Sequence, residues 1–160
     1  MSIFTATEVA SYVYNKYRTS YSREISPIKL QKSLYFLFAY WGGYIRRAQM
    51  NSDFVEDDVS EFFEEELFDD EIQAWAYGPV IPNVYFNSDY KKEFYNRIEE
   101  NEYIREFIDD ILDEIFDISD FKLVDISHMD MAWRRNYNRN DEFHDNEIPK
   151  EEIIQEYATR

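Results

Sequence analysis

Residues 71–85 read EIQAWAYGPVIPNVY, and this stretch decides the fold. Apolar and other side chains alternate over residues 72–77, which is the period of a half-buried β-strand. Gly78-Pro79 then fixes a turn, because glycine reaches backbone angles that other residues avoid and proline locks φ. Pro82 suits the first turn of a short helix. The stretch holds no nucleophile and no phosphate-binding loop, and it therefore favours a binding role over catalysis.

The sequence on both sides of residues 71–85 shows helical periodicity. Apolar residues recur at helical spacing over 9–17, 28–41 and 103–116, and a terminal helix is expected after Pro149. No linker is long enough to divide the chain. We expect a mostly α, single compact helical domain over residues 1–160, with about six helices and a short β-strand or hairpin around residues 72–77.

Several helix boundaries can be predicted from local chemistry. Thr5 or Thr7 is expected to cap the first helix, and Ser26-Pro27 supplies an N-cap and a first-turn proline for the second. Gly42-Gly43 either ends or kinks that second helix, or permits close packing against a neighbour. Residues 121–127 begin a further helix or a short extended segment.

Composition restricts the class of partner. The chain carries 34 acidic against 17 basic residues, for a net charge of −17, and has no cysteine. Such a charge argues against direct binding of nucleic acid and of anionic membranes, and favours a basic protein partner. No apolar run reaches the roughly 20 residues of a membrane-spanning helix. A cytoplasmic location is expected, and the oligomeric state stays open.

The acidic residues concentrate in one segment. Between Ala48 and Tyr90 there are twelve Asp and Glu residues and no Lys or Arg. Its densest part, residues 53–71, mixes carboxylates with apolar side chains, and a short helix is expected there. The segment at about 49–70 is interpreted as an acidic insertion in the domain. Apolar anchors with a charged rim suit a protein interface, although an acidic helix packed on its own core is equally consistent. The predicted partner-binding residues are Asp53, Glu56, Asp57, Asp58, Glu61, Phe62, Phe63, Glu64, Glu65 and Glu66.

Four segments, taken together and in order, resemble the Panacea antitoxin domain family, which includes SocA-like antitoxins and phage-associated GepA-type proteins. These segments are SPIKLQKSLY at 26–35, AWAYGPVIPNVY at 74–85, LVDISH at 123–128 followed by Trp133, and the terminal helix from Ile148 to Tyr157. Ser127 and Ala132 stand where the family usually has threonine and proline. The acidic segment is longer and more acidic than the family's usual connection.

The resemblance implies a mostly helical domain that neutralises a toxin by direct contact. It also implies that the motif residues form a scaffold rather than a catalytic centre. These residues are Lys29, Gln31, Trp75, Tyr77, Gly78, Pro79, Pro82, His128 and Trp133.

The sequence shows only weak patterns for a metal site or a catalytic centre. His128, Asp130, His144 and Asp145 form a poor metal-ligand pattern without cysteine, and a core or capping role is expected for His128. Ser127 lies beside His128, but adjacency in sequence does not make a catalytic triad. We therefore expect no enzyme activity, no metal and no cofactor.

Three groups of side chains are expected to have intramolecular rather than ligand-binding roles. Trp75, Tyr77 and Trp133 are expected to be core aromatics rather than the lining of a ligand pocket. Lys29 and Lys32 are expected to pack their stems and pair their charges with carboxylates of the same chain. The basic residues Arg134, Arg135 and Arg139 are likewise expected to be internal counter-charges.

The leading functional hypothesis is an antitoxin of a toxin–antitoxin pair, or a phage-borne relative, that neutralises a protein partner. The alternative is a mobile-element inhibitor of a host defence nuclease, acting as an acidic nucleic-acid mimic. On the helix at 102–117 the acids fall about 2.7 Å apart along the axis, within the ~1.7–3.4 Å spacing of duplex phosphates. That spacing permits mimicry without distinguishing it from a solvated helix face.

Overall fold

The computed structural model of the protein describes residues 2–50, 64–92, 96–138 and 146–160. Within these residues the predicted mostly helical class is confirmed, with seven α-helices and one small sheet. The order is α1 (Ala6–Tyr21), α2 (Pro27–Met50), β1 (Gln73–Trp75), β2 (Gly78–Val80), α3 (Pro82–Tyr85), the 3-10 turns η2 (Asp89–Lys91) and η3 (Arg97–Glu100), α4 (Glu102–Phe116), α5 (Asp120–His128), α6 (Met131–Asn136), β3 (Asn146–Glu147) and α7 (Lys150–Ala158).

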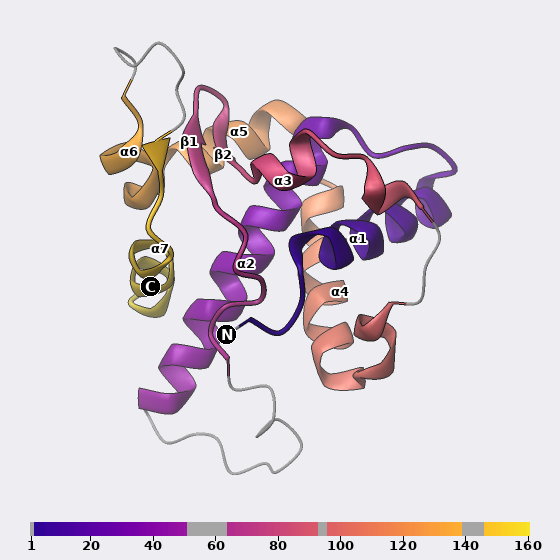
Figure 1. Ribbon diagram of the computed structural model, residues 1–160, viewed down its shortest axis with the longest axis horizontal. Helices are drawn as coiled ribbons and strands as arrows, with labels where there is room; N and C mark the ends of the chain where they lie inside the picture. Colours follow the sequence, from indigo (N-terminus) through magenta and orange to yellow (C-terminus); the bar gives the residue numbers. More distant parts are fainter. Residues whose placement is uncertain (1, 51–63, 93–95, 139–145) are drawn as a thin grey trace.

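Helix α2 is the axis of the fold (Figure 1). Its N-terminus is capped as predicted, because Ser26 Oγ accepts a hydrogen bond from the Lys29 amide at 3.0 Å. Helix α1 begins with a capping box in which Thr5, not Thr7, bonds the Glu8 amide and Glu8 bonds back. Helices α1, α4 and α7 cover α2, so the long helix is buried on most of its circumference.

The glycine pair in α2 serves close packing. The helix continues unbroken to Met50. A Cβ on Gly43 would lie 2.7 Å from the backbone carbon of Tyr157, and one on Gly42 would lie 2.7 Å from the Ile154 side chain. The absence of side chains on this face therefore lets α7 lie directly against α2.

The predicted corner is a β-hairpin. β1 and β2 pair antiparallel with Gln73 opposite Val80, and β3 pairs with the other edge of β1, giving the order β2-β1-β3. Ile72 and Ala74 are buried, as the alternation predicts, whereas Ala76 lies in the exposed turn. Pro82 stands at the first position of α3, as expected.

Helix α4 is amphipathic and is capped by Asn101. Its buried residues are Ile104, Ile108, Leu112, Ile115 and Phe116, and all lie within the stretch 103–116 whose apolar spacing predicted this helix. Tyr103 lies at the margin of this face and shares a hydrogen bond with Tyr44 of α2. The segment after Ser119 is helical rather than extended.

The predicted short helix within 53–71 is not found in its described part. Residues 64–71 form bends, since the Ile3 and Phe4 amides donate to the carbonyls of Glu66 and Leu67. Pairing with the N-terminal segment takes the backbone acceptors that a helix would use. Residues 53–63 lie outside the described residues. Within the described ranges, no helix has the length and apolar character needed to cross a membrane.

Candidate functional site

The Gly-Pro corner packs directly on two helices. Gly78 has φ of +108°, a conformation that side chains disfavour. A Cβ at this position would meet Ser127 Oγ of α5 at 2.4 Å and Lys32 Cε of α2 at 3.0 Å. Glycine is thus required both for the turn and for the contact, which agrees with the predicted scaffold role of Gly78.

Two side chains from the C-terminal half hold the hairpin. His128 Nε2 lies 2.9 Å from the Ala76 carbonyl oxygen, and Trp133 Nε1 donates to the Trp75 carbonyl at 2.9 Å. The two rings stack with centroids 4.2 Å apart. His128 therefore anchors the turn of the hairpin, in keeping with a structural role.

Gln31 fixes the end of the hairpin to α2. Its Oε1 accepts from the Ile81 amide at 2.8 Å, and its Nε2 donates to the Ile81 carbonyl at 3.4 Å. The side-chain amide thus satisfies both backbone groups of a buried residue just before α3. The hairpin is consequently positioned by α2, α5 and α6 together.

The two lysines of the segment at 26–35 differ in their contacts. Lys29 donates to the Phe116 carbonyl at 3.0 Å and lies 3.7 Å from Asp120, so its predicted intramolecular pairing is confirmed. Lys32 is 1% exposed and donates to the Pro79 carbonyl at 3.2 Å. Among the described residues no carboxylate forms an ion pair with Lys32, and that part of the prediction is wrong. Burial lowers the pKa of Lys32 to about 7.

Lys32 lines a groove, hereafter the Lys32 groove, between the N-terminal half of α2 and the hairpin with α3. Its volume is about 650 Å³, within the range of small-molecule sites. None of the described residues that line it carries a carboxylate, although the chain has 34 acidic residues. The residues that carry the argument below are Ile28, Lys32, Trp75, Tyr77, Tyr85 and Phe86.

Aromatic rings form the outer wall of the groove. Trp75 contacts Tyr85 edge to face at 4.9 Å and Phe86 at 5.9 Å. Tyr77 is 63% exposed and Phe86 75% exposed. The prediction that Trp75 and Tyr77 are core residues is therefore wrong: Trp75 is half-buried, Tyr77 is exposed, and both line the groove that faces α2. Trp133 is buried, as predicted.

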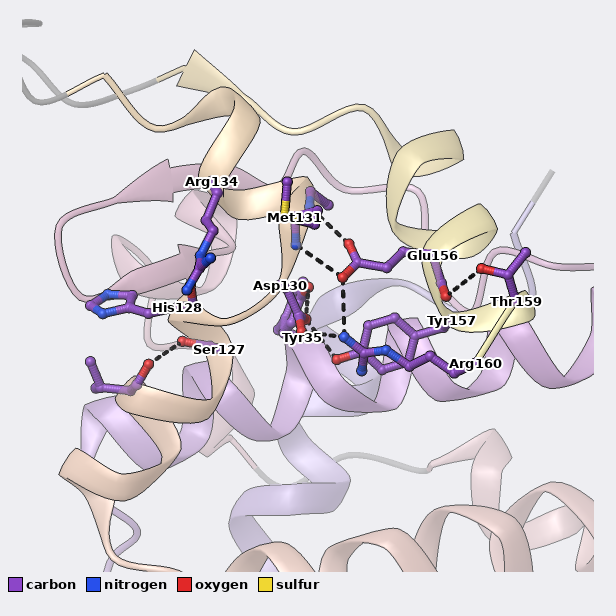
Figure 2. Close-up of polar contacts among 12 residues, drawn as sticks. Tyr35, Ser127, His128, Asp130, Met131, Arg134, Glu156, Tyr157, Thr159 and Arg160 are labelled. Carbon is purple, nitrogen blue, oxygen red and sulfur yellow. Dashed lines mark hydrogen bonds and ion pairs between the residues drawn. The ribbon is translucent and has the colours of Figure 1, made fainter.

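A buried polar network lies beside the hairpin, around Asp130 (Figure 2). Asp130 Oδ2 accepts hydrogen bonds from the hydroxyls of Tyr35 at 2.5 Å and Tyr157 at 2.6 Å. Its Oδ1 lies 2.7 Å from the Arg160 guanidinium. Burial, together with the neighbouring Tyr157 and Asp130, raises the pKa of Tyr35 well above its usual value.

This network joins α2, α6 and α7. Glu156 of α7 accepts from the amides of Met131 and Ala132, which are otherwise orphan donors at the start of α6. Arg160 also lies 3.1 Å from Glu156. Asp130 is therefore a structural carboxylate, and the arrangement lacks a nucleophile placed beside a base.

The described end of the acidic segment is tied to α2. Arg46 holds Glu65 through two hydrogen bonds of 2.8 and 2.9 Å and also pairs with Glu151 at 2.7 Å. Trp41 Nε1 donates to the Glu64 carbonyl at 2.9 Å. Glu65 thus has a structural partner. Glu64 is exposed and Glu66 is half-buried.

Further predicted residues fall outside the site or outside the described part of the chain. Arg135 lies 3.7 Å from Glu152, as expected of a counter-charge, whereas Arg134 donates to the His128 carbonyl. Outside the described residues lie Asp53, Glu56, Asp57, Asp58, Glu61, Phe62, Phe63, Arg139, His144 and Asp145. Within the described residues, no group of three or more His, Asp or Glu side chains is placed to hold a metal ion.

Sequence reasoning missed the groove and the Asp130 network. Tyr85-Phe86, two adjacent aromatics just after the Gly-Pro corner, were the available signal for the wall of the groove. Nothing in the sequence marked Tyr35 or Arg160 as partners of Asp130, because these residues are distant in the chain.

The comparison with protein families agrees with the motifs. The family model for the antitoxin SocA-like Panacea domain matches residues 54–134, which include the hairpin, α5 and Trp133. The chain belongs to this family. The segments at 26–35 and 148–157 lie beyond the matched residues. No curated protein and no solved structure matches the chain.

Membership in an antitoxin-like family supports a role of the toxin–antitoxin type, with a protein as partner. The assignment of residues 1–160 to one domain with an acidic insertion stays a prediction.

Proposed function

We propose that this protein is an antitoxin that neutralises a basic protein partner by direct binding, without catalysis, through the acidic segment at 53–66. The observation that carries the proposal is the contact between the described end of this segment and helix α2. Glu64 is bonded to Trp41, and Trp41 packs edge to face on Phe107 of α4 at 5.2 Å. The described end of the acidic segment, at Glu64, therefore lies near the N-terminal part of α4.

That part of α4 is itself negative. Tyr44 of α2 contacts Tyr103, which places the start of α4 against the C-terminal half of α2. The exposed carboxylates on η3 and the first turns of α4 are Glu99, Glu100, Glu102 and Glu106. We call this region, with Glu64–Glu66, the acidic end. A concentration of one sign of charge attracts an oppositely charged partner and speeds its association.

The test compares two variants with the same change in charge. In the first, Asp57→Asn, Asp58→Asn, Glu61→Gln and Glu64→Gln are combined, while Glu65 is kept because it pairs with Arg46. In the second, Asp110→Asn, Glu114→Gln, Asp125→Asn and Glu147→Gln remove four exposed acids elsewhere on the surface.

Each tagged protein is used to capture partners from its native host, and the captured toxin is then co-expressed with it. The first variant should lose capture and growth rescue, and the second should keep both. Association with the parent should also slow as salt rises, because the Debye length shrinks to about 8 Å at 0.15 M. Equal capture and rescue by the two variants would refute the acidic segment as the binding surface.

The nucleic-acid mimic hypothesis makes a different prediction for the same complex. If the acidic end imitates a polyanion, duplex DNA or RNA should displace the protein from its partner. The exposed carboxylates Asp110, Asp113 and Glu114 of α4 would then contribute, and the second variant would also weaken binding. Binding unaffected by nucleic acid would exclude mimicry and leave the antitoxin role intact.

A further inference from the structure

The Lys32 groove combines apolar walls with one buried nitrogen. Lys32 is 1% exposed, yet it lines the groove, so it lies at the floor. An ammonium has three hydrogen-bond donors, and the acceptor found for Lys32 among the described residues is the Pro79 carbonyl. The floor can therefore donate to a further acceptor supplied by a ligand.

Charge in the groove favours an anionic acceptor. Among the described residues that line the groove, none has a carboxylate that would neutralise Lys32 or attract a cation. Tyr77 and Tyr85 are the other titratable groups among the described lining residues. The neighbouring elements carry Lys29 on α2 and Asp120, Lys122, Asp125 and His128 on α5. Desolvation is the cause of the lowered pKa of Lys32. A carboxylate beside a desolvated amine forms a charge-assisted hydrogen bond, which is stronger than a neutral one.

The walls favour a flat apolar body. Trp75, Tyr85 and Phe86 contact each other at 4.9 to 5.9 Å and leave ring surface exposed at the rim. Ile28 of α2 lines the groove opposite the hairpin. Aromatic rings stack on or contact other flat rings edge to face.

We propose that the Lys32 groove is a binding site for a small aromatic carboxylate, whose ring lies against Trp75, Tyr85 and Phe86 and whose carboxylate meets Lys32 Nζ. This site is separate from the acidic end, and the inference does not depend on the proposed antitoxin activity. Binding raises the pKa of Lys32, since a neighbouring negative charge favours the ammonium form. The complex therefore takes up a proton above about pH 7, where the amine of the free protein is mostly neutral.

Calorimetric titration with benzoate, cinnamate and indole-3-acetate tests the site on the full chain, with the corresponding primary amides as neutral probes of the same shape. At least one carboxylate should bind saturably, about tenfold or more tightly than its amide. At pH 8 the binding heat should vary with the ionisation enthalpy of the buffer, showing proton uptake, and at pH 6 this variation should shrink.

Lys32→Met should abolish the preference for the carboxylate and the proton uptake, while Lys122→Met, which removes an exposed lysine of α5, should leave both unchanged. Circular dichroism checks that Lys32→Met is folded. If it is not, Phe86→Ala, on the exposed rim, serves instead and should weaken binding while proton uptake persists. The proposal is overturned if no carboxylate binds at about 5 mM, where a ligand with a Kd of about 1 mM would be mostly bound, or if acid and amide bind equally well.

Discussion

The two halves of α2 carry basic side chains in opposite circumstances. In the N-terminal half, Lys32 is buried under the hairpin, with a carbonyl as its acceptor and no carboxylate among the groove residues that the structure describes. In the C-terminal half, Arg46 is 16% exposed and is held by Glu65 and Glu151. The N-terminal half of α2 thus borders a groove whose described lining is free of carboxylates, whereas its C-terminal half packs beside the acidic end.

The difference shows that the charge of a protein does not decide the character of each surface. With 34 acidic residues, a carboxylate could have been placed beside every basic group. Arg46 receives two because its guanidinium lies near the surface, where water screens the cost of holding charge. Lys32 receives none in the described part of the chain, and burial without a counter-charge is costly for the ammonium form. Such an arrangement is typical of functional rather than purely structural groups.

The largest effect is expected at the hairpin over Lys32. Gly78→Val forces a branched side chain into φ of +108° and into the space of Ser127 Oγ, which lies 2.4 Å from the Cβ position. Backbone strain and overpacking together should lower the free energy of unfolding by about 4 kcal/mol. Urea unfolding followed by circular dichroism measures this loss, with Ala76→Ser in the exposed turn as the control. A change below about 1 kcal/mol would mean that the hairpin does not pack on α5 as described.

A smaller loss of stability is expected when the Asp130 network beside the hairpin is disrupted. Asp130→Asn removes the carboxylate that accepts from Tyr35, Tyr157 and Arg160, and leaves buried donors with poor partners. The free energy of unfolding should fall by about 3 kcal/mol. The same denaturation experiment measures it, and Asp110→Asn on the exposed face of α4 should be close to neutral. Equal stability of the two variants would contradict the burial of Asp130.

Lys32→Met sharpens the comparison through its dependence on pH. The folded pKa of Lys32 is about 7, against its ordinary value of 10.5, so the unfolded chain binds one more proton between these values. The parent therefore gains stability as pH rises through this window, by up to about 1.4 kcal/mol per unit. The methionine variant lacks this gain. The free energy of unfolding of the variant should exceed that of the parent most at pH 7, and this difference should shrink toward pH 9.5.

Paired unfolding curves of parent and variant at four pH values test this difference, because contributions from all other groups cancel. A constant difference across the range would show that Lys32 stays charged in the folded protein.

The smallest effect is expected at the acidic end. Glu65→Gln weakens a pair that Glu151 continues to support from the other side of Arg46. The expected loss is about 0.5–1 kcal/mol at low salt, and it should fade at 1 M salt, where the Debye length is about 3 Å. Thermal unfolding at both salt concentrations measures it, with Glu64→Gln as the neighbouring control. A loss of stability as large as that of Asp130→Asn would contradict the expectation that the Arg46–Glu65 pair contributes less than the buried Asp130 network.

Local features of the fold were predictable because they depend on neighbours in sequence. The Ser26 cap, the Pro82 helix start and the Gly78 corner follow from the chemistry of single residues. The apolar stripe of α4 follows from its periodicity. The helix expected within 53–71 is not found in residues 64–71, because this part of the segment pairs with the N-terminal residues instead.

The candidate site was predictable only in part. His128 and Trp133 were assigned to the scaffold on the strength of a motif, and they do hold the hairpin. Trp75 and Tyr77 were placed in the core because large aromatics are usually buried there. Trp75 lies in a three-residue strand, and alternation alone cannot choose which face of that strand is buried without knowing what packs on it. Tyr77 lies in the turn beyond the strand and is exposed.

The sequence by itself determined the helical class, the position of the hairpin, the strong negative charge and the membership in the Panacea family. These depend on period, turn chemistry, composition and motif, all of which are properties of the chain read in order. Tertiary structure alone decided that Lys32 lies without a carboxylate in an aromatic groove while Arg46 has two. The two carboxylates that pair with Arg46 are 19 and 105 positions away in the chain, and only folding brings them to it.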